Sequence, residues 1–244
     1  MRPSLATCAL LPCLVGIATT DASAQFQFAP PASVLAGSEP SGVAMADYDF
    51  DGDIDIATTV DNPDRVVILL NDGGLFTAGP TILLPNSSSP GELVAGDFDQ
   101  DNGGMPDDLA VTLRDFNTVA VLLNQNGILT LAGQYGVGTN ARGLDVGDYD
   151  GDGDPDLAVA NRDDNTATAL TNAGNGTFTG QTLGVGLEPR AAAFADYDAD
   201  GDLDLAVTNS DSRDISLFRR DAAGYVLAQT LPVGFTVRPE GITG

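Results

Sequence analysis

The sequence predicts an all-β protein of the β-propeller class, with about four four-stranded blades in a partial or unclosed ring. Three observations lead to this fold. An aspartate-rich loop recurs, and the first aspartates of successive copies are 50, 51 and 48 residues apart. Short apolar runs alternate with turn residues between these loops, which is typical of repeated β-structure. No segment of the mature chain keeps the apolar period of a helix, and the length of the repeat fits a blade of four strands.

The composition agrees with a folded, turn-rich chain. Its 244 residues include 29 Gly and 14 Pro, and the hydrophobic fraction of 43 % is enough to bury a core. The chain has 35 Asp and Glu against 10 basic residues, which gives a formal net charge of −25. Such an acidic surface neither neutralises a phosphate backbone nor binds an anionic membrane, so we expect no nucleic-acid partner and no membrane insertion.

Two missing residue types limit the chemistry. The chain contains no His and no Lys. His-dependent catalytic triads and His-ligated zinc are therefore excluded, as are the phosphate-loop lysine and Schiff-base catalysis. No convincing catalytic constellation remains, so the sequence predicts that the protein is not an enzyme.

The first 24 residues, Met1–Ala24, are predicted to be a secretory signal peptide. Arg2 gives a positive start, and an apolar stretch too short to span a membrane follows it. A small-residue cleavage pattern ends at Ala24, so Gln25 would begin a mature chain without cysteine. The predicted location is secreted, either extracellular or on the cell surface, with the periplasm as the alternative.

Each repeat is expected to contain the same elements in the same order. In the first repeat, a strand of small residues at 42–46 precedes the acidic loop, and an apolar strand at 54–60 follows it. A polar turn leads to a second apolar strand at 66–70, and a glycine-containing turn leads to the last strand at 81–84. The later repeats show the same sequence of strands and turns.

The array is predicted to fill residues 25–244, with a partial blade at each end. Residues 25–36 resemble the last strand of one blade, and 238–244 resemble the opening strand of another. An unclosed array leaves strand edges exposed, which predicts self-association through these edges. The acidic loops between the two ends lie at 47–55, 97–108, 148–156 and 196–204.

The four loops are predicted to be cation sites, because clustered carboxylates repel one another strongly unless a cation lies among them. In the first loop, we expect the side chains of Asp47, Asp49, Asp51 and Asp55 to be ligands, together with the backbone carbonyl of Asp53. The third and fourth loops repeat this register. The complete predicted ligand set is Asp47, Asp49, Asp51, Asp53, Asp55, Asp97, Asp99, Asp101, Asp108, Asp148, Asp150, Asp152, Asp154, Asp156, Asp196, Asp198, Asp200, Asp202 and Asp204.

Calcium is the predicted ion, with about four Ca²⁺ and one in each loop. Flexible ligation by many oxygen atoms favours Ca²⁺ over Zn²⁺, and it makes Mg²⁺ the weaker candidate. An EF-hand is excluded because Thr58 stands where that loop requires a bidentate Glu. The alternative of solvated acidic turns is disfavoured, because three matching loops and one variant recur at blade spacing. The second loop is the least certain site, since it has three extra residues before Asp108.

The aromatic residues at the second position of the loops are expected to pack between blades. A ligand-stacking platform is the alternative for these side chains, but core packing is the commoner use. The residues are Tyr48, Phe98, Tyr149 and Tyr197.

The repeats resemble the FG-GAP/VCBS family, the calcium-loop blades of integrin α-subunit propellers and of many exported bacterial proteins. The resemblance rests on the D-x-D-x-D-G-D-x-D loops and on the turn Asn172-Ala-Gly-Asn-Gly-Thr-Phe178. It implies a β-propeller with one Ca²⁺ per loop, in which each loop joins the inner two strands of a blade. Family propellers commonly have more blades than the four seen here.

Three classes of function are compatible with these observations. The first is an extracellular binding, adhesion or interaction module for a protein or glycan, in which Ca²⁺ has a structural role. The second is a carbohydrate-active enzyme, a lyase or hydrolase or a fragment of one, built on a calcium propeller. The third is a purely structural unit of a larger cell-surface protein, of which this chain would be a partial copy. We favour the first, because Glu39, Glu188 and Glu240 occupy one repeat position and so indicate a turn element more than a unique catalyst.

Overall fold

A computed structural model of the chain contains four antiparallel sheets of four strands each, and its described residues, 37–221, 224–234, 239 and 241, form no helix. The first sheet comprises β1 (Pro40–Ala46), β2 (Asp55–Val60), β3 (Arg65–Asp72) and β4 (Leu75–Leu83). The second comprises β5 (Pro90–Gly96), β6 (Asp108–Leu113), β7 (Thr118–Asn124) and β8 (Leu129–Gly136). The third comprises β9 (Ala141–Gly147), β10 (Asp156–Asn161), β11 (Thr166–Asn172) and β12 (Phe178–Gly184). The fourth comprises β13 (Pro189–Ala195), β14 (Asp204–Asn209), β15 (Asp214–Asp221) and β16 (Gly224–Pro232).

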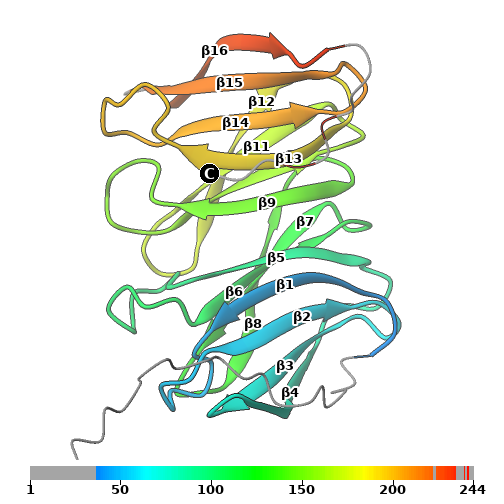
Figure 1. Ribbon diagram of the computed structural model, residues 1–244, viewed down its shortest axis with the longest axis vertical. Coiled ribbons are helices and arrows are strands. Elements are labelled where there is room, and N and C mark those ends of the chain that lie inside the picture. The colour runs from blue at the N-terminus through cyan, green and yellow to red at the C-terminus, as the bar shows by residue number, and fades with distance from the viewer. Residues whose placement is uncertain (1–36, 222–223, 235–238, 240, 242–244) are drawn as a thin grey trace, which may run out of the picture. The chain divides into compact units, whose positions relative to one another are not determined.

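The sheets are blades that follow one another in chain order. Within each sheet the strands pair in sequence order. The first strands of successive sheets contact each other, β1 with β5, β5 with β9 and β9 with β13 (Figure 1). Inner strands that meet in this way are the arrangement of a β-propeller. The predicted fold class is confirmed, and the four described blades form an open array.

The apolar core lies between successive blades. One cluster of buried side chains joins the first and second blades, another the second and third, and a third the third and fourth. The ring of Phe98 meets that of Phe178 edge-on at 5.6 Å, and Tyr149 lies 5.7 Å from Phe194 of the next blade. Blades therefore stabilise one another mainly by burying apolar surface against their neighbours.

The aromatic residues at the second loop position are buried in the first three blades. Tyr48, Phe98 and Tyr149 are at most 4 % exposed, which confirms the predicted core packing for them. Tyr197 differs and is 44 % exposed. It belongs to the fourth blade, and the structure describes no further blade beyond it.

The last strand of a blade begins earlier than the sequence indicated. We expected 81–84 in the first blade, whereas β4 begins at Leu75. The reason is the turn from β3, where Gly73 and Gly74 both have positive φ, 58° and 95°. Two consecutive residues of this kind form a tight hairpin turn that matches the twist of the strands, so β4 pairs with β3 directly after it.

Gly143 allows the inner strands of the third and fourth blades to approach closely. A Cβ atom at this position would lie 2.5 Å from the Cα of Ala191 and 2.8 Å from the carbonyl oxygen of Arg190. Both are backbone atoms, so a side chain fits only if one strand shifts. We expect Gly143→Ala to lower the free energy of unfolding by about 1–3 kcal/mol, as measured by urea denaturation.

Gly136 provides a matched control for this substitution. It also lies in a strand, but nothing is within 4 Å of a Cβ placed there. Gly136→Ala should therefore change the unfolding free energy by only a few tenths of a kcal/mol. Equal effects of the two substitutions would show that the close approach at Gly143 does not limit packing.

Several predictions fall on residues that the structure does not describe. They are the signal peptide Met1–Ala24, the partial blade at 25–36 and most of the opening strand at 238–244. In the part of the chain that the structure describes, no helix has the length and apolar character needed to cross a membrane.

Candidate metal centre

Each acidic loop joins the first strand of a blade to its second strand. The residue before the loop pairs with the aspartate that ends it, as Ala46 does with Asp55 and Gly147 with Asp156. The four loops therefore lie at the same end of their sheets, on the left in Figure 1. We number the loop positions from the first aspartate, so that Asp47 is at position one and Asp55 at position nine. In the second loop, which has three extra residues, Asp108 ends the loop and is also called position nine.

Carboxylates from positions one, three and nine converge in every loop. One oxygen from each of the three side chains lies within 4.8 Å of the others. The position-nine aspartate is buried in all four loops, whereas positions one and three are partly or fully exposed except for Asp97, which is also buried. The four groups are Asp47, Asp49 and Asp55; Asp97, Asp99 and Asp108; Asp148, Asp150 and Asp156; and Asp196, Asp198 and Asp204.

The position-nine aspartate also holds the blade together. In the third blade, Asp156 accepts hydrogen bonds from the backbone N–H of Tyr149 at 3.1 Å and from that of Asn172 at 2.7 Å. One carboxylate thus connects the loop, the second strand that it opens and the end of the third strand. Asp55 and Asp108 accept the equivalent pairs of bonds in the first two blades.

Burial and neighbouring charge make ionisation of these aspartates costly. Desolvation raises the pKa of Asp156 to about 7, and the charges of Asp150 and Asp152 act in the same direction, although the two amide bonds oppose them. Desolvation likewise raises the pKa of Asp108 to about 6. The carboxylates of each loop therefore lie closer together than their mutual repulsion favours. A cation among them would relieve this repulsion.

Position one shapes the loop by accepting bonds from its own backbone. Asp47 accepts from the N–H groups of Asp51 and Gly52 at 3.2 and 2.9 Å. The chain reverses at position four, where the backbone is left-handed in all four loops. The φ values are 63° at Phe50, 58° at Gln100, 77° at Gly151 and 62° at Ala199. Only the third loop has glycine there, so the sequence pattern gave no sign of this requirement.

Positions five and seven are arranged differently from one and three. Asp51 and Asp152 at position five do not join the converging groups; each accepts a bond from the N–H two residues later, at 2.9 and 3.0 Å. The position-seven carboxylates of Asp53 and Asp154 bond outside the loop, to the Gly73 N–H and the Gln100 amide. Ligation by the backbone carbonyl of Asp53 stays a prediction. Side-chain ligation by position five stays a prediction.

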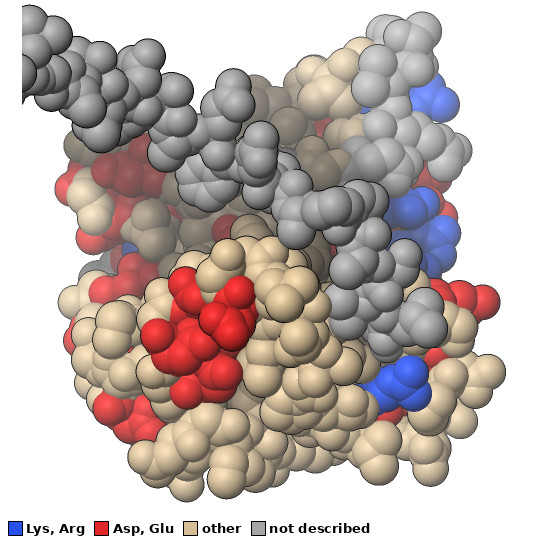
Figure 2. Space-filling view, turned by 60° about the horizontal axis from the view of Figure 1, so that its bottom comes forward, with Lys and Arg blue, Asp and Glu red and all other residues tan. Residues whose placement is uncertain are grey.

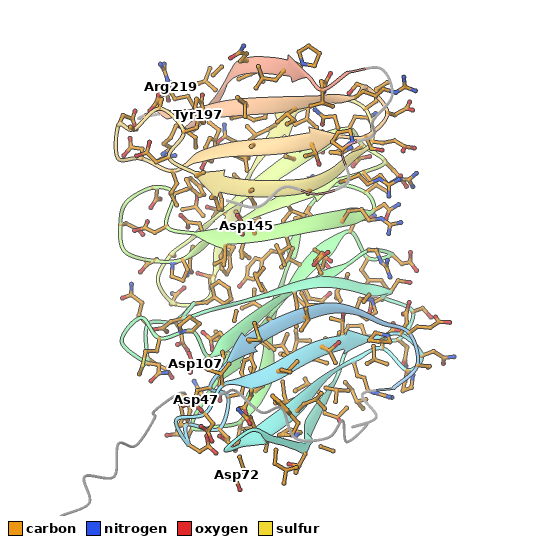
Figure 3. The ribbon with its side chains drawn as sticks, viewed as in Figure 1. Asp47, Asp72, Asp107, Asp145, Tyr197 and Arg219 are labelled. Atoms are coloured by element: carbon orange, nitrogen blue, oxygen red, sulfur yellow. The ribbon has the colours of Figure 1, made fainter. Side chains whose placement is uncertain are left out.

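The second loop contains an acidic residue that the sequence analysis left out. Its insertion places Asp107 beside Asp97 and Asp101, and the oxygens of these three side chains also lie within 4.8 Å of one another. Asp107 is fully buried, and neither of its oxygens has a hydrogen-bond partner. It lies at the same end of the blades as Asp47 (Figure 3). The loop that we expected to be the least certain site therefore gathers more buried carboxylate than the others.

The composition of the clusters fits a hard divalent cation. Buried oxygens of Asp97, Asp107, Asp150 and Asp204 have no hydrogen-bond partner among the described residues. A buried carboxylate oxygen without a partner is costly, and an oxygen-only donor set is what Ca²⁺ and Mg²⁺ select. Such an ion would supply the positive charge that the described residues of the loops do not.

Replacing Asp107 tests the repulsion in the second loop directly. Desolvation, with added repulsion from Asp108, raises the pKa of Asp107 to about 7. At pH 8, Asp107→Asn should therefore raise the unfolding free energy of the calcium-free protein by roughly 1–3 kcal/mol. The gain should shrink at pH 5, where Asp107 itself is protonated. An equal gain at both pH values, measured by urea denaturation in EDTA, would contradict this explanation.

Two successive segments match the profile of the FG-GAP-like repeat, residues 104–159 and residues 148–207. Each match contains the converging aspartates of the third loop. Residues 104–207 match FG-GAP-like repeats, and the resemblance drawn from the loops is thereby confirmed over these residues. No curated protein sequence matches the chain.

Several solved structures are similar to this chain in fold. A protein from Lactobacillus plantarum has a TM-score of 0.65 and 14 % identity, and the match covers 84 % of this chain and 59 % of that one. BBS1N, solved in complex with ARL6DN, has a TM-score of 0.61 and 16 % identity, with 86 % and 61 % covered. The periplasmic gluconolactonase of Pseudomonas aeruginosa has a TM-score of 0.53 and 18 % identity, with 80 % and 70 % covered. The chain spans about three-fifths of the length of the first two.

Proposed function

We propose that the chain is an exported calcium-binding repeat protein that acts as an extracellular binding or interaction module for a protein or glycan. The observation that supports this most is the convergence of three carboxylates in each of four loops, each group including one buried aspartate. The FG-GAP-like repeats agree with it. The prediction that the chain is not an enzyme stays a prediction.

Calcium would have a structural role in this proposal. The carboxylates of a loop come from the end of the first strand and the start of the second, and the position-nine aspartate also bonds the third strand. Compensating their charge would therefore fix three of the four strands of a blade at one end. The predicted mature chain lacks cysteine, so ions would act where other exported domains use disulfides.

Calcium suits the clusters better than magnesium does. Position one accepts bonds from the loop backbone, position three lies within the loop, and position nine begins the second strand, which allows many oxygens at adjustable distances. Ca²⁺ accepts six to eight such ligands, whereas Mg²⁺ needs a small, regular octahedron and keeps its waters. We therefore expect selectivity for Ca²⁺.

A binding titration of the mature chain tests this proposal. Isothermal titration with Ca²⁺, followed by native mass spectrometry, should show about four ions per chain, and Mg²⁺ should bind much more weakly. The double substitution Asp148→Ala and Asp152→Ala should remove one ion. Asp72→Ala makes a comparable loss of charge at an exposed aspartate outside the loops and should remove none (Figure 3). A folded chain that binds no Ca²⁺ would contradict the proposal.

A further inference from the structure

Six of the eight arginines among the described residues lie at the end of the blades opposite the acidic loops. Each first strand starts and each second strand ends there, because the pair is antiparallel around the loop. Figure 2 shows blue arginine side chains along one side of the molecule and a compact red acidic patch away from them. The arginines at this end are Arg65, Arg114, Arg142, Arg162, Arg190 and Arg213.

A hollow of about 360 Å³ lies at this end between the second and third blades. Its wall includes Arg114 and Asn117, which follow β6, and Asn140 and Arg142 at the start of β9. Its volume is at the lower end of small-molecule sites, about 300–1,000 Å³. Every residue of the wall is polar or charged, so an apolar ligand would find little to bury against.

Arg142 is the charged group of this wall that has no partner. Its guanidinium makes no hydrogen bond or ion pair with any described residue, and its Nε is buried. Burial lowers the pKa of Arg142, the neighbouring guanidinium groups of Arg114, Arg162 and Arg190 lower it further, and the charge of Asp163 opposes them. The three guanidinium groups repel Arg142, so an anion placed beside it would be attracted.

The other charged groups of the hollow are already engaged. Arg114 donates to the carbonyl oxygens of Ser89 and Pro90 at 3.0 and 3.3 Å. Asp115 accepts from the Ser89 hydroxyl at 2.6 Å. Asp163 accepts from Asn140 at 3.1 Å and from Arg162 at 3.3 Å.

We infer that this hollow is a binding site for an acidic sugar, with Arg142 holding the single carboxylate of the ligand. A guanidinium binds a carboxylate through two parallel N–H donors, and Arg142 has these donors uncommitted. The amides of Asn117 and Asn140 and the carboxylates of Asp115 and Asp163 provide polar atoms for sugar hydroxyl groups.

The two acidic residues of the wall, Asp115 and Asp163, limit the number of negative charges that a ligand of this hollow can carry. Arg114 and Arg142 are balanced by Asp115 and Asp163, so a ligand with many negative charges would meet repulsion as well as attraction. A ligand with one carboxylate and several hydroxyl groups can accept hydrogen bonds from Arg142 through the carboxylate and donate hydrogen bonds to Asp115 and Asp163 through the hydroxyls. The inference goes beyond the calcium proposal, and it rests on residues at the opposite end of the blades.

Galacturonate and galactose are suitable probes, because they differ only in the carboxylate. We expect galacturonate, titrated at millimolar concentrations into the calcium-saturated chain, to shift the NMR signal of the Arg142 side-chain Nε–H, and galactose to bind at least tenfold more weakly. Arg142→Ala should lower galacturonate affinity at least tenfold, and Arg142→Lys should restore part of it. Arg219→Ala removes the same charge from an exposed position at the acidic end and should leave the affinity unchanged (Figure 3).

The alternatives give different results in the same titration. Equal binding of galactose, or galacturonate binding unaffected by Arg142→Ala, would overturn the inference. So would stronger binding of inorganic phosphate than of galacturonate, because that result would indicate a simple anion site. A neutral oligosaccharide that carries one galacturonate residue and binds more tightly than the monomer would identify a polysaccharide as the source of the sugar, whereas tighter binding of an oligogalacturonide would contradict the single-carboxylate inference. A urea unfolding curve of each variant separates loss of the site from loss of the fold.

Discussion

Chelation of calcium is expected to lower the Tm of the protein sharply, and to lower it more at pH 8 than at pH 5. An ion present at 100–1,000 times its Kd stabilises the folded state by about 3–4 kcal/mol. Four sites acting together would therefore contribute on the order of 10 kcal/mol, which is comparable with the whole stability of a typical domain. Scanning calorimetry in Ca²⁺, Mg²⁺ and EDTA measures this effect.

The pH dependence follows from the raised pKa values of the loop aspartates. Burial raises the pKa of Asp107 and Asp156 to about 7 and that of Asp108 to about 6, well above the value of an unfolded aspartate. Without calcium, the folded chain therefore binds more protons than the unfolded chain. It loses stability as the pH rises from about 4 to about 7. A bound cation would compensate the ionised groups, so the difference between Ca²⁺ and EDTA should increase over the same range.

Two results would contradict this expectation. If Mg²⁺ stabilised the chain as much as Ca²⁺, the loops would be general divalent sites. If the calcium effect were independent of pH between 5 and 8, the buried carboxylates would not be the groups that the ion compensates. The exposed substitution Asp72→Ala should leave both the size and the pH dependence of the effect unchanged.

The blades could be predicted because their signals are local and repeated. The spacing of Asp47, Asp97, Asp148 and Asp196 gives the repeat length, and each loop lies between two short runs that the turn residues around them mark as strands. The convergence of positions one, three and nine also follows from a nine-residue loop whose ends are paired, as Ala46 and Asp55 are. These features depend on residues within about ten positions of one another.

The rest of the site depends on residues that are distant in the sequence. The Asn172 amide donates to the carbonyl oxygen of Phe98 at 2.9 Å, across 74 residues and between two blades. Asn124 makes the corresponding bond to Tyr48 at 3.0 Å. An asparagine at the end of the third strand in successive repeats was a signal that could have been recognised. The burial of Asp107 and the isolation of Arg142 had no such signal, because they result from how neighbouring blades pack.

Asp156→Ala is expected to destabilise the protein even when no calcium is present. The substitution leaves the buried N–H groups of Tyr149 and Asn172 without their acceptor. Each orphaned amide costs about 1–3 kcal/mol, so the loss should reach about 2–6 kcal/mol in EDTA at pH 5, as measured by urea denaturation. At pH 8 the loss in EDTA should be smaller, because the variant also removes an ionised carboxylate whose burial is unfavourable.

Calcium should enlarge the effect of the same substitution. The Asp156 carboxylate belongs to the converging group of the third loop, so its removal should also take away the stabilisation by one ion, about 3–4 kcal/mol under saturating conditions. The loss of unfolding free energy caused by Asp156→Ala, measured against the unsubstituted chain under the same conditions, should then be largest in calcium at pH 8. An effect no larger than that of Asp72→Ala in EDTA would show that the two amide bonds do not hold the third strand. A loss that is the same in calcium and in EDTA would place the ion away from Asp156.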